Sequence, residues 1–256
     1  MDFLNLPKRT AGERTYGLTV VIDVGTPKKE LEHFLAEYHH LIDMFKMGIG
    51  SAYITPNLKE KVELCKKFAI KPYCGGTLFE KCYVQNKIPE YLAKLRELGI
   101  EWVEVSNGTV DIPLPERLKL IEHIKKDFHV IAEVGSKDAD IHMPGSRWKE
   151  EIRLLLEAGC DYVTAEGRST GNAGIYKSNG EIKEHLIKEL LYDLDSKKII
   201  FEAPAPSQQI YFIKLIGPNV NLGNIRLRDV LSLEAQRQGL KSETFYLEES
   251  ECKLLL

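Results

Sequence analysis

The chain has 256 residues, of which 43% are hydrophobic and 29% are charged, and its formal net charge at pH 7 is −3. This composition is ordinary for a soluble globular protein, and it allows an adequate core without disulfides or structural metals. Because there is no strong basic excess to neutralise phosphates, the charge argues against a nucleic-acid partner.

Targeting signals and cysteine usage bear on the compartment. The first 15 residues lack the apolar stretch of a signal peptide, and no apolar run approaches the ~20 residues that a membrane span needs. Five cysteines occur without a C-x-x-C pair or a zinc-like spacing with histidine, which is typical of free thiols. We therefore expect a cytoplasmic protein with no membrane contact.

Short apolar runs rich in Val and Ile recur along the chain and alternate with amphipathic stretches. The runs predict strands at Leu18–Asp23, Ile42–Met47, Ile70–Cys74, Trp102–Ser106, Val130–Val134, Tyr162–Glu166, Ile199–Ala203 and Val220–Leu222. Helical periodicity follows most of them, for example at Lys28–Tyr38, Leu58–Phe68, Pro89–Leu98 and Pro115–Lys126. Gly99 and Gly159 come just after amphipathic runs, where a left-handed residue commonly ends a helix.

This alternation predicts βα units around a parallel sheet. No linker or charge block divides the chain, so we expect one domain over residues 1–256, with an N-terminal extension at 1–16 and a tail at 245–256. Eight strands favour a closed barrel over an open sheet, because at that count side chains just fill the interior. The predicted fold is α/β, a single (β/α)8 TIM barrel.

Charged residues gather where the predicted strands end, and in a parallel barrel that end carries the active site. Side chains two apart on a strand share a face, so these carboxylates are expected to point into the barrel. They are Asp23, Glu104, Glu133, Glu166 and Glu202. Buried carboxylates need positive partners nearby. The candidates are Lys46, Lys137, Arg168 or a bound metal.

Carboxylates from consecutive strands suit Mg2+, which prefers hard oxygen ligands and keeps several waters. Glu133 and Glu166 are the first candidates for its ligands, with Glu104 and Glu202 behind them. The alternative is a structural layer of ion pairs inside the barrel, which would also shift pKa values. Clustering at the catalytic face favours chemistry over that alternative.

A glycine-rich stretch at 217–225 leads through the last strand, placed within Asn219–Asn224, into a helix near Arg228–Gln238. Phosphates commonly bind barrels at the last loops, on backbone N–H groups and a helix N-terminus. Asn221, Gly223 and Asn224 are therefore candidate phosphate-binding residues, with Asn224 as a helix cap. A plain turn is the alternative. Gly76 and Thr77 offer a second, similar backbone site.

Several motifs resemble one family, the phosphosulfolactate synthases, from about Gly17 to Thr244. The matching stretches are Ile42–Gly48, Gly75–Glu80, Glu104–Thr109, Glu133–Asp138, Glu166–Arg168, Phe201–Pro204 and Gly217–Ile225. The resemblance implies a (β/α)8 barrel and a Mg2+-dependent carbon–sulfur lyase. Such an enzyme adds sulfite to phosphoenolpyruvate, giving (2R)-2-phospho-3-sulfolactate through an enediolate-like intermediate. In methanogens this step opens coenzyme M biosynthesis.

The resemblance also implies roles for individual residues. Lys137, or failing it Lys46, would protonate the substrate as a general acid at a lowered pKa. Arg168 would hold sulfite or a carboxylate. The substrate would further contact Ser106 and Asn107, which follow the fourth strand, and we expect a homo-oligomer, as is common for such barrels.

The sequence departs from the family pattern beside the pocket. Asp23-Val24-Gly25 replaces a common Asp-Lys-Gly, Gly48-Ile49-Gly50-Ser51 replaces Gly-Trp-Gly-Thr, and Arg168-Ser169-Thr170-Gly171 replaces Arg-Glu-Ser-Gly. Two alternatives therefore stay open. One is a related enzyme that adds a different nucleophile to an enol phosphate or similar acceptor. The other is a non-catalytic, stress-associated or scaffold member of the family, against which the retained charged residues speak.

Overall fold

The computed structural model describes residues 3–138 and 143–247. Its strands form a closed barrel in which each strand pairs in parallel with the next and β8 closes onto β1. The strands are β1 (Thr19–Asp23), β2 (Met44–Met47), β3 (Lys71–Cys74), β4 (Trp102–Val105), β5 (His129–Val134), β6 (Tyr162–Ala165), β7 (Ile199–Glu202) and β8 (Leu222–Arg226). The predicted (β/α)8 barrel is confirmed.

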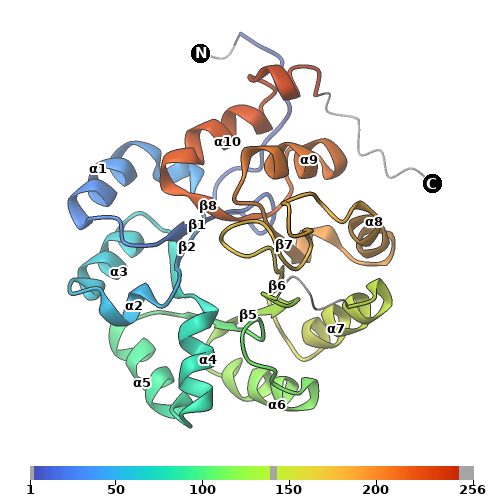
Figure 1. Cartoon of the computed structure of the whole chain (residues 1–256). Coiled ribbons are helices and arrows are strands. Elements are labelled where there is room, and N and C mark those ends of the chain that lie inside the picture. Colours follow the sequence, from blue (N-terminus) through green and yellow to red (C-terminus); the bar gives the residue numbers. More distant parts are fainter. Residues whose placement is uncertain (1–2, 139–142, 248–256) are drawn as a thin grey trace.

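Helices surround the barrel on the outside (Figure 1). They are α1 (Lys28–Tyr38), α2 (Ser51–Ile54), α3 (Leu58–Lys67), α4 (Gly76–Val84), α5 (Ile88–Leu98), α6 (Leu114–Ile124), α7 (Gly145–Glu157), α8 (Glu184–Asp193), α9 (Pro206–Ile216) and α10 (Val230–Arg237), with short 3-10 helices η1 (His39–Leu41), η2 (Ser196–Lys198), η3 (Leu227–Asp229) and η4 (Ser242–Thr244). The longer helices pack apolar side chains on the strands, as α1 does with its fully buried Leu31 and Leu35. Within the described ranges, none of these helices has the length and apolar character needed to cross a membrane.

The last strand lies later in the chain than the sequence predicts. It covers Leu222–Arg226 rather than Val220–Leu222. Gly223 weakens the apolar pattern there, but the structure explains it: a Cβ at this position would lie 3.0 Å from the Cγ2 of Ile200. The crowded barrel interior therefore favours glycine inside a strand, where periodicity alone predicts a turn.

The barrel interior is built in two levels. The lower level is an apolar cluster of side chains, made of Leu18, Val20, Met44, Tyr73, Trp102, Ile131, Tyr162 and Ile200. Two residues further along several strands, the inward side chains are charged: Lys46, Glu104, Glu133 and Glu202 are all buried. The apolar level forms a floor below the charged one.

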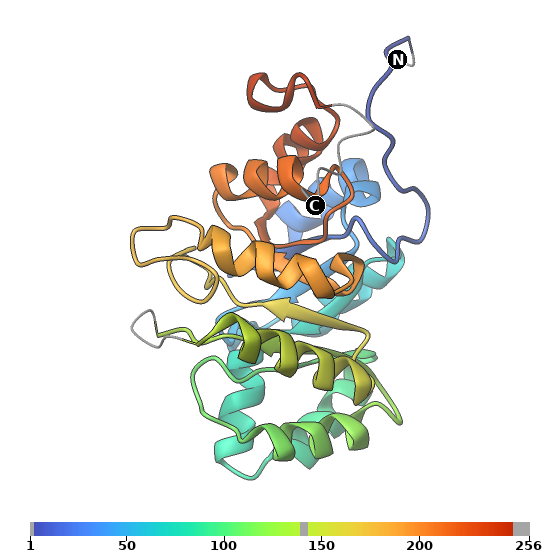
Figure 2. The same cartoon turned by 90° about the vertical axis from the view of Figure 1, so that its right-hand side faces the viewer.

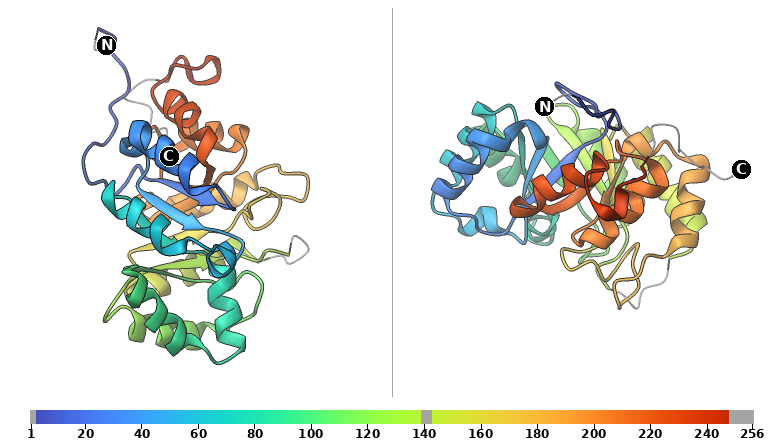
Figure 3. Two further views of the ribbon diagram at one scale, coloured as in Figure 1. Left: turned by 90° about the vertical axis from the view of Figure 1, so that its left-hand side faces the viewer. Right: turned by 90° about the horizontal axis from the view of Figure 1, so that it is seen from above.

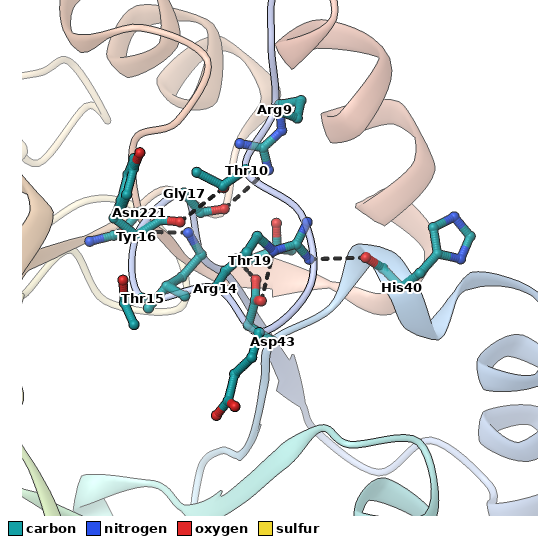
Figure 4. Close-up of polar contacts among 12 residues, drawn as sticks. Arg9, Thr10, Arg14, Thr15, Tyr16, Gly17, Thr19, His40, Asp43 and Asn221 are labelled. Atoms are coloured by element: carbon teal, nitrogen blue, oxygen red, sulfur yellow. Dashed lines mark hydrogen bonds and ion pairs between the residues drawn. The ribbon is translucent and has the colours of Figure 1, made fainter. Parts of the chain in front are cut away.

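The N-terminal segment crosses the amino end of the barrel, opposite the loops that follow the strands (Figures 2 and 3). Arg9 donates to the carbonyl of Gly17 and to Asn219, and Arg14 pairs with Asp43 at 2.8 Å and donates to the carbonyl of His40 (Figure 4). The predicted extension at 1–16 thus packs on the barrel over its described part. Residues 1–2 and 248–256, including most of the predicted tail, lie outside the described residues.

Asn221 belongs to this amino end and not to a phosphate site. Its Oδ1 accepts from the backbone N–H of Leu18, and its Nδ2 donates to the carbonyls of Lys197 and Ile199. Asn221 precedes β8, so its side chain ties together the starts of three strands. This corrects the prediction that Asn221 binds substrate at the carboxyl ends of the strands, since those ends lie at the opposite side of the barrel.

Candidate active site

A cavity of about 290 Å³ opens at the carboxyl ends of the strands. Side chains from strand ends and from the following loops line it. They are Ile22, Lys46, Ile49, Gly75, Gly76, Thr77, Glu133, Lys137, Glu166, Arg168, Ser169, Glu202 and Asn224. Most of the predicted catalytic and metal-binding residues therefore converge on one cavity.

Lys46 lies at the centre of the barrel between two carboxylates. Its Nζ is 3.0 Å from Oε1 of Glu104 and 3.1 Å from Oε1 of Glu202. Burial disfavours the charged lysine, but the attraction of both carboxylates outweighs it and raises the pKa of Lys46 well above its usual value. Burial also raises the pKa of Glu104 to about 7, although Lys46 opposes this shift. These three residues form an internal ion cluster.

Glu133 and Glu166 form a second pair, in which two buried carboxyl groups lie next to each other and influence each other's protonation. Burial and the charge of Glu133 raise the pKa of Glu166 well above its usual value. Burial works against the ionised form of Glu133 as well, but Lys137 and the neighbouring carboxyl group of Glu166 lower its pKa to about 2. Oε2 of Glu166 is buried and has no hydrogen-bond partner. The pKa values of these two neighbouring carboxyl groups are therefore shifted in opposite directions, and Glu166 is the more readily protonated of the two.

Lys137 reaches the cavity from the loop after β5. Its Nζ lies 3.3 Å from Glu133 and 3.8 Å from both Glu166 and Glu80, and its side chain is 24% exposed. Burial would lower the pKa of Lys137, but the three carboxylates raise it. This corrects the prediction of a lowered lysine pKa for Lys137, as it does for Lys46, because both lie among negative charges.

Glu80 is a buried member of the site that the strand pattern does not reveal. It lies on α4, one turn from the helix start, and its Oε1 accepts from the hydroxyl of Ser106 and from the N–H of Thr109. Its Oε2 has no hydrogen-bond partner and faces Lys137. The only sequence signal is its place within the Gly75–Glu80 motif.

The carboxylates also anchor the loops around the cavity. Glu104 accepts from the N–H of Gly76, at the start of α4, and Glu202 accepts from the N–H of Gly167 at 2.9 Å. A Cβ on Gly76 would lie 2.2 Å from the Cβ of Ser106, so only glycine allows this close approach. Each of these two glutamates thus uses one oxygen for a loop and the other for Lys46.

Other predicted residues lie close to the cavity but do not line it. Ser106 is fully buried below it and also donates to Glu133 at 2.9 Å. Gly223 faces the barrel interior against Ile200 and Glu202. Asn107 lines a separate, neighbouring cavity, and its Oδ1 accepts from the N–H of Ile112. Asn107 thus lies outside the cavity at the strand ends, and its contact with the substrate stays a prediction.

Asp23 and Asn224 differ from their expected roles. The cation beside Asp23 is Lys61 of α3, at 2.7 Å, and not one of the active-site cations. Asn224 does not cap the following helix, whose N-cap residue is Asp229. Instead Asn224 lies within β8, is 3% exposed, and lines the cavity with a buried Oδ1 that has no hydrogen-bond partner.

The charge of the site is unbalanced. Five carboxylates meet three cations, Lys46, Lys137 and the exposed Arg168. The carboxylates outnumber the cations even with a proton on Glu166. A polyanionic ligand would be repelled by this arrangement, unless a further positive charge enters with it.

Comparison with known proteins places the chain in a family. The family model for (2R)-phospho-3-sulfolactate synthase matches residues 7–243. The chain belongs to the phosphosulfolactate synthase family. It is 38% identical over 250 residues to a phosphosulfolactate synthase of Bacillus subtilis, covering 96% of this chain and 99% of that protein. It is 42% identical over 235 residues to one of Methanocaldococcus jannaschii, covering 90% of this chain and 94% of that protein.

A solved structure supports the fold alone. The 3-keto-L-gulonate-6-phosphate decarboxylase of Vibrio cholerae superposes with a TM-score of 0.53 at 11% identity, covering 91% of this chain and 99% of that one. At such low identity the match shows a shared barrel architecture and carries no statement about substrate. The predicted family is thus confirmed by sequence relatives, and the fold by structure.

Proposed function

We propose that this protein catalyses the Mg2+-dependent addition of sulfite to phosphoenolpyruvate, giving (2R)-2-phospho-3-sulfolactate. The observation that carries the proposal is the cavity at the strand ends, where Lys137, Glu133 and Glu166 converge in a chain of this family. Phosphosulfolactate is the product named for the relatives, and the roles of the residues follow from the chemistry of the site.

Glu133 and Glu166 fit a divalent cation. Their carboxyl groups are buried next to each other, and one oxygen of Glu166 has no hydrogen-bond partner, so a cation could bind between them. The described residues contain no cluster of three or more metal-ligating side chains. Mg2+ does not require one, since it commonly uses one or two carboxylates, waters and the substrate itself. When bound, Mg2+ would supply the positive charge that the site lacks.

Glu104 and Glu202 fit the metal less well. Both already contact Lys46 with one oxygen and a backbone N–H with the other. We propose that they hold Lys46 in place, which leaves Glu133 and Glu166 as the metal ligands. Lys46 then contributes a fixed positive charge below the substrate.

In the proposed reaction, the sulfur lone pair of sulfite attacks the methylene carbon, and a carbon–sulfur bond forms. The π electrons of the double bond move onto the adjacent carbon and the carboxylate, as an enediolate. Lys137 then transfers its Nζ proton to that adjacent carbon and regains a proton from solvent. The side chain of Lys137 is 24% exposed, so its Nζ can reach both the substrate and solvent. The phosphate ester stays intact throughout.

Two further side chains are assigned to the anionic groups. Arg168 lies at the cavity mouth, is exposed, and offers a planar guanidinium for sulfite or the substrate carboxylate. The N–H of Thr77 at the α4 start and the nitrogen of the Asn224 amide suit the phosphate, because the neighbouring N–H groups of Gly75, Gly76 and Leu78 already donate within the protein. The loops that Glu104 and Glu202 anchor, together with the apolar floor of the barrel, hold these side chains in place when no substrate is bound.

The test uses purified protein with phosphoenolpyruvate and sulfite, with Mg2+ or with a chelator, followed by phosphorus NMR and mass spectrometry. We expect phosphoenolpyruvate to be consumed only with sulfite and Mg2+, and the product to retain its phosphate and gain one sulfonate. Folded protein that leaves phosphoenolpyruvate unchanged under these conditions would contradict the proposal. Consumption with another nucleophile in its place would identify the related enzyme instead.

A further inference from the structure

Backbone strain gathers around the active-site cavity. In residues 3–138 and 143–247, five non-glycine residues have a left-handed backbone: Ile49, Ala69, Asn86, Arg168 and Asn224. Three of them, Ile49, Arg168 and Asn224, line this one cavity. Strained residues tend to persist where function requires their geometry, so this grouping points to roles for all three.

Ile49 is the most unusual of the three. Its φ is 50°, a conformation that a β-branched side chain rarely adopts, whereas asparagine tolerates it. The turn around it is held firmly: the N–H of Gly48 donates to the carbonyl of Asp23, and the N–H of Ser51 donates to the carbonyl of Gly48, both at 2.8 Å. Lys61 in turn fixes the carboxylate of Asp23 at 2.7 Å. The surrounding structure thus imposes the strained conformation.

The side chain of Ile49 is placed where no packing explains it. It is 61% exposed, yet it lines the cavity. The larger side chains that share this cavity are mostly charged or polar, and only Ile22 joins Ile49 as an apolar one. The left-handed backbone of Ile49 costs stability, and packing of its side chain in the described residues does not explain why an isoleucine stands there.

The proposed substrate explains this position. An enol phosphate is anionic at its carboxylate and phosphate, and its one apolar part is the methylene carbon that sulfite attacks. We propose that Ile49 is a specificity-determining residue: its side chain contacts the methylene end of the substrate and disfavours a substituent there. This inference rests on the proposed function and names the acceptor class, an enol phosphate with an unsubstituted methylene.

The experiment compares wild type with I49G and with A69G as a matched control. Ala69 has the same left-handed backbone, with φ of 56°, but lies outside this cavity. Both glycine variants relieve strain, so both should unfold at the wild-type temperature or slightly above it. Activity is measured with phosphoenolpyruvate and with its homologue that carries a methyl group on the methylene carbon, with sulfite and Mg2+ in excess.

The readout is the ratio of kcat/KM for the two substrates. One extra methyl group in a tight pocket commonly changes this ratio by about 10- to 200-fold. We expect I49G to reduce the preference for phosphoenolpyruvate by roughly tenfold or more relative to wild type, and A69G to leave it unchanged. The lower intrinsic reactivity of the homologue cancels, because it is the same for every variant.

Failure of the inference about Ile49 and failure of the proposed function give different results. If wild type turns over phosphoenolpyruvate and folded I49G keeps the wild-type preference, the inference about Ile49 is wrong and the proposed function stands. If wild type does not consume phosphoenolpyruvate with sulfite, the proposed function is wrong and this inference falls with it. An equal loss of preference in A69G would also overturn the inference, since strain relief alone would then explain it.

Discussion

Charged side chains are buried at both ends of the barrel, but their partners differ. At the amino end, the two terminal nitrogens of Arg237 donate to the carbonyls of Pro218, Val220 and Leu18, although its Nε has no hydrogen-bond partner, and Arg14 is held by Asp43 and a carbonyl. At the carboxyl end, buried oxygens of Glu80, Glu166 and Asn224 have no hydrogen-bond partner. The buried charges of the amino end are thus bound mainly by backbone carbonyls and Asp43, whereas the carboxyl end leaves carboxylate and amide oxygens without a hydrogen bond around one cavity.

This difference separates stability from function. A buried charge with its hydrogen bonds made holds the native structure together, and removing its partner is costly. A buried acceptor without a partner costs stability, so its persistence points to a ligand that supplies the missing charge or proton. We therefore expect substitutions at the amino end to lower stability, and substitutions at the carboxyl end to lower activity.

The largest effect is expected at Lys137. The K137A variant should lose activity by about 10³-fold, because a positioned general acid commonly contributes 10²- to 10⁴-fold. Initial rates of phosphoenolpyruvate consumption measure this, with circular dichroism to confirm folding. The matched control is K94A, which removes an exposed lysine paired with Glu97 on α5 and should keep full activity. A K137A variant that retains more than a tenth of wild-type activity would remove Lys137 from the mechanism.

At the amino end, D43A should lower stability and spare activity. Asp43 accepts from Arg14 and from the N–H of Thr19, so its loss leaves a buried guanidinium unpaired. We expect the free energy of unfolding in urea to fall by about 3 kcal/mol. The control is D127A, which breaks the exposed pair with Arg96 and should cost less than about 1 kcal/mol. A large drop in kcat with unchanged stability would contradict the division between the two ends.

A smaller effect is expected from Glu104 through pH. Its folded-state pKa is raised to about 7, above the ordinary value of 4.5, so the folded protein binds this proton more tightly than the unfolded chain. The stability that the protonated Glu104 contributes is fully present below pH 4.5 and is lost as the pH rises through 7. The thermal unfolding midpoint of E104Q, measured with a chelator, should therefore rise relative to that of wild type as the pH increases from 5 to 8. An exposed control, E122Q, should follow wild type, and an identical pH slope in E104Q would refute the interpretation.

Much of the barrel is predictable because strand and helix periods differ. Alternation along Trp102 and Glu104 places one in the apolar floor and the other in the charged level above it, as the structure shows. The last strand is harder, because Gly223 interrupts its pattern for a packing reason that only the closed barrel reveals. The end of the barrel at which Asn221 lies depends on that one strand boundary.

The site is less predictable than the fold, because its partners come from other elements. Lys61 reaches Asp23 from α3, and Glu80 reaches Lys137 from α4, so neither follows from the strand ends. The direction of the lysine pKa shifts also depends on distances to carboxylates on several strands. Periodicity identifies which side chains point inward, but pairing among them is a property of the folded barrel.

In our proposal, Glu133 and Glu166 bind the metal, whereas Glu104 and Glu202 hold Lys46. The decisive test is binding of Mn2+ as a substitute for Mg2+, measured by electron paramagnetic resonance. Wild type should bind Mn2+ in competition with Mg2+, and E166Q should weaken binding by more than about tenfold, since even outer partners of a metal commonly matter that much. E202Q, which alters the Lys46 cluster instead, should bind within a few-fold of wild type. Binding that survives in E166Q and is lost in E202Q would contradict the assignment of the metal to Glu133 and Glu166.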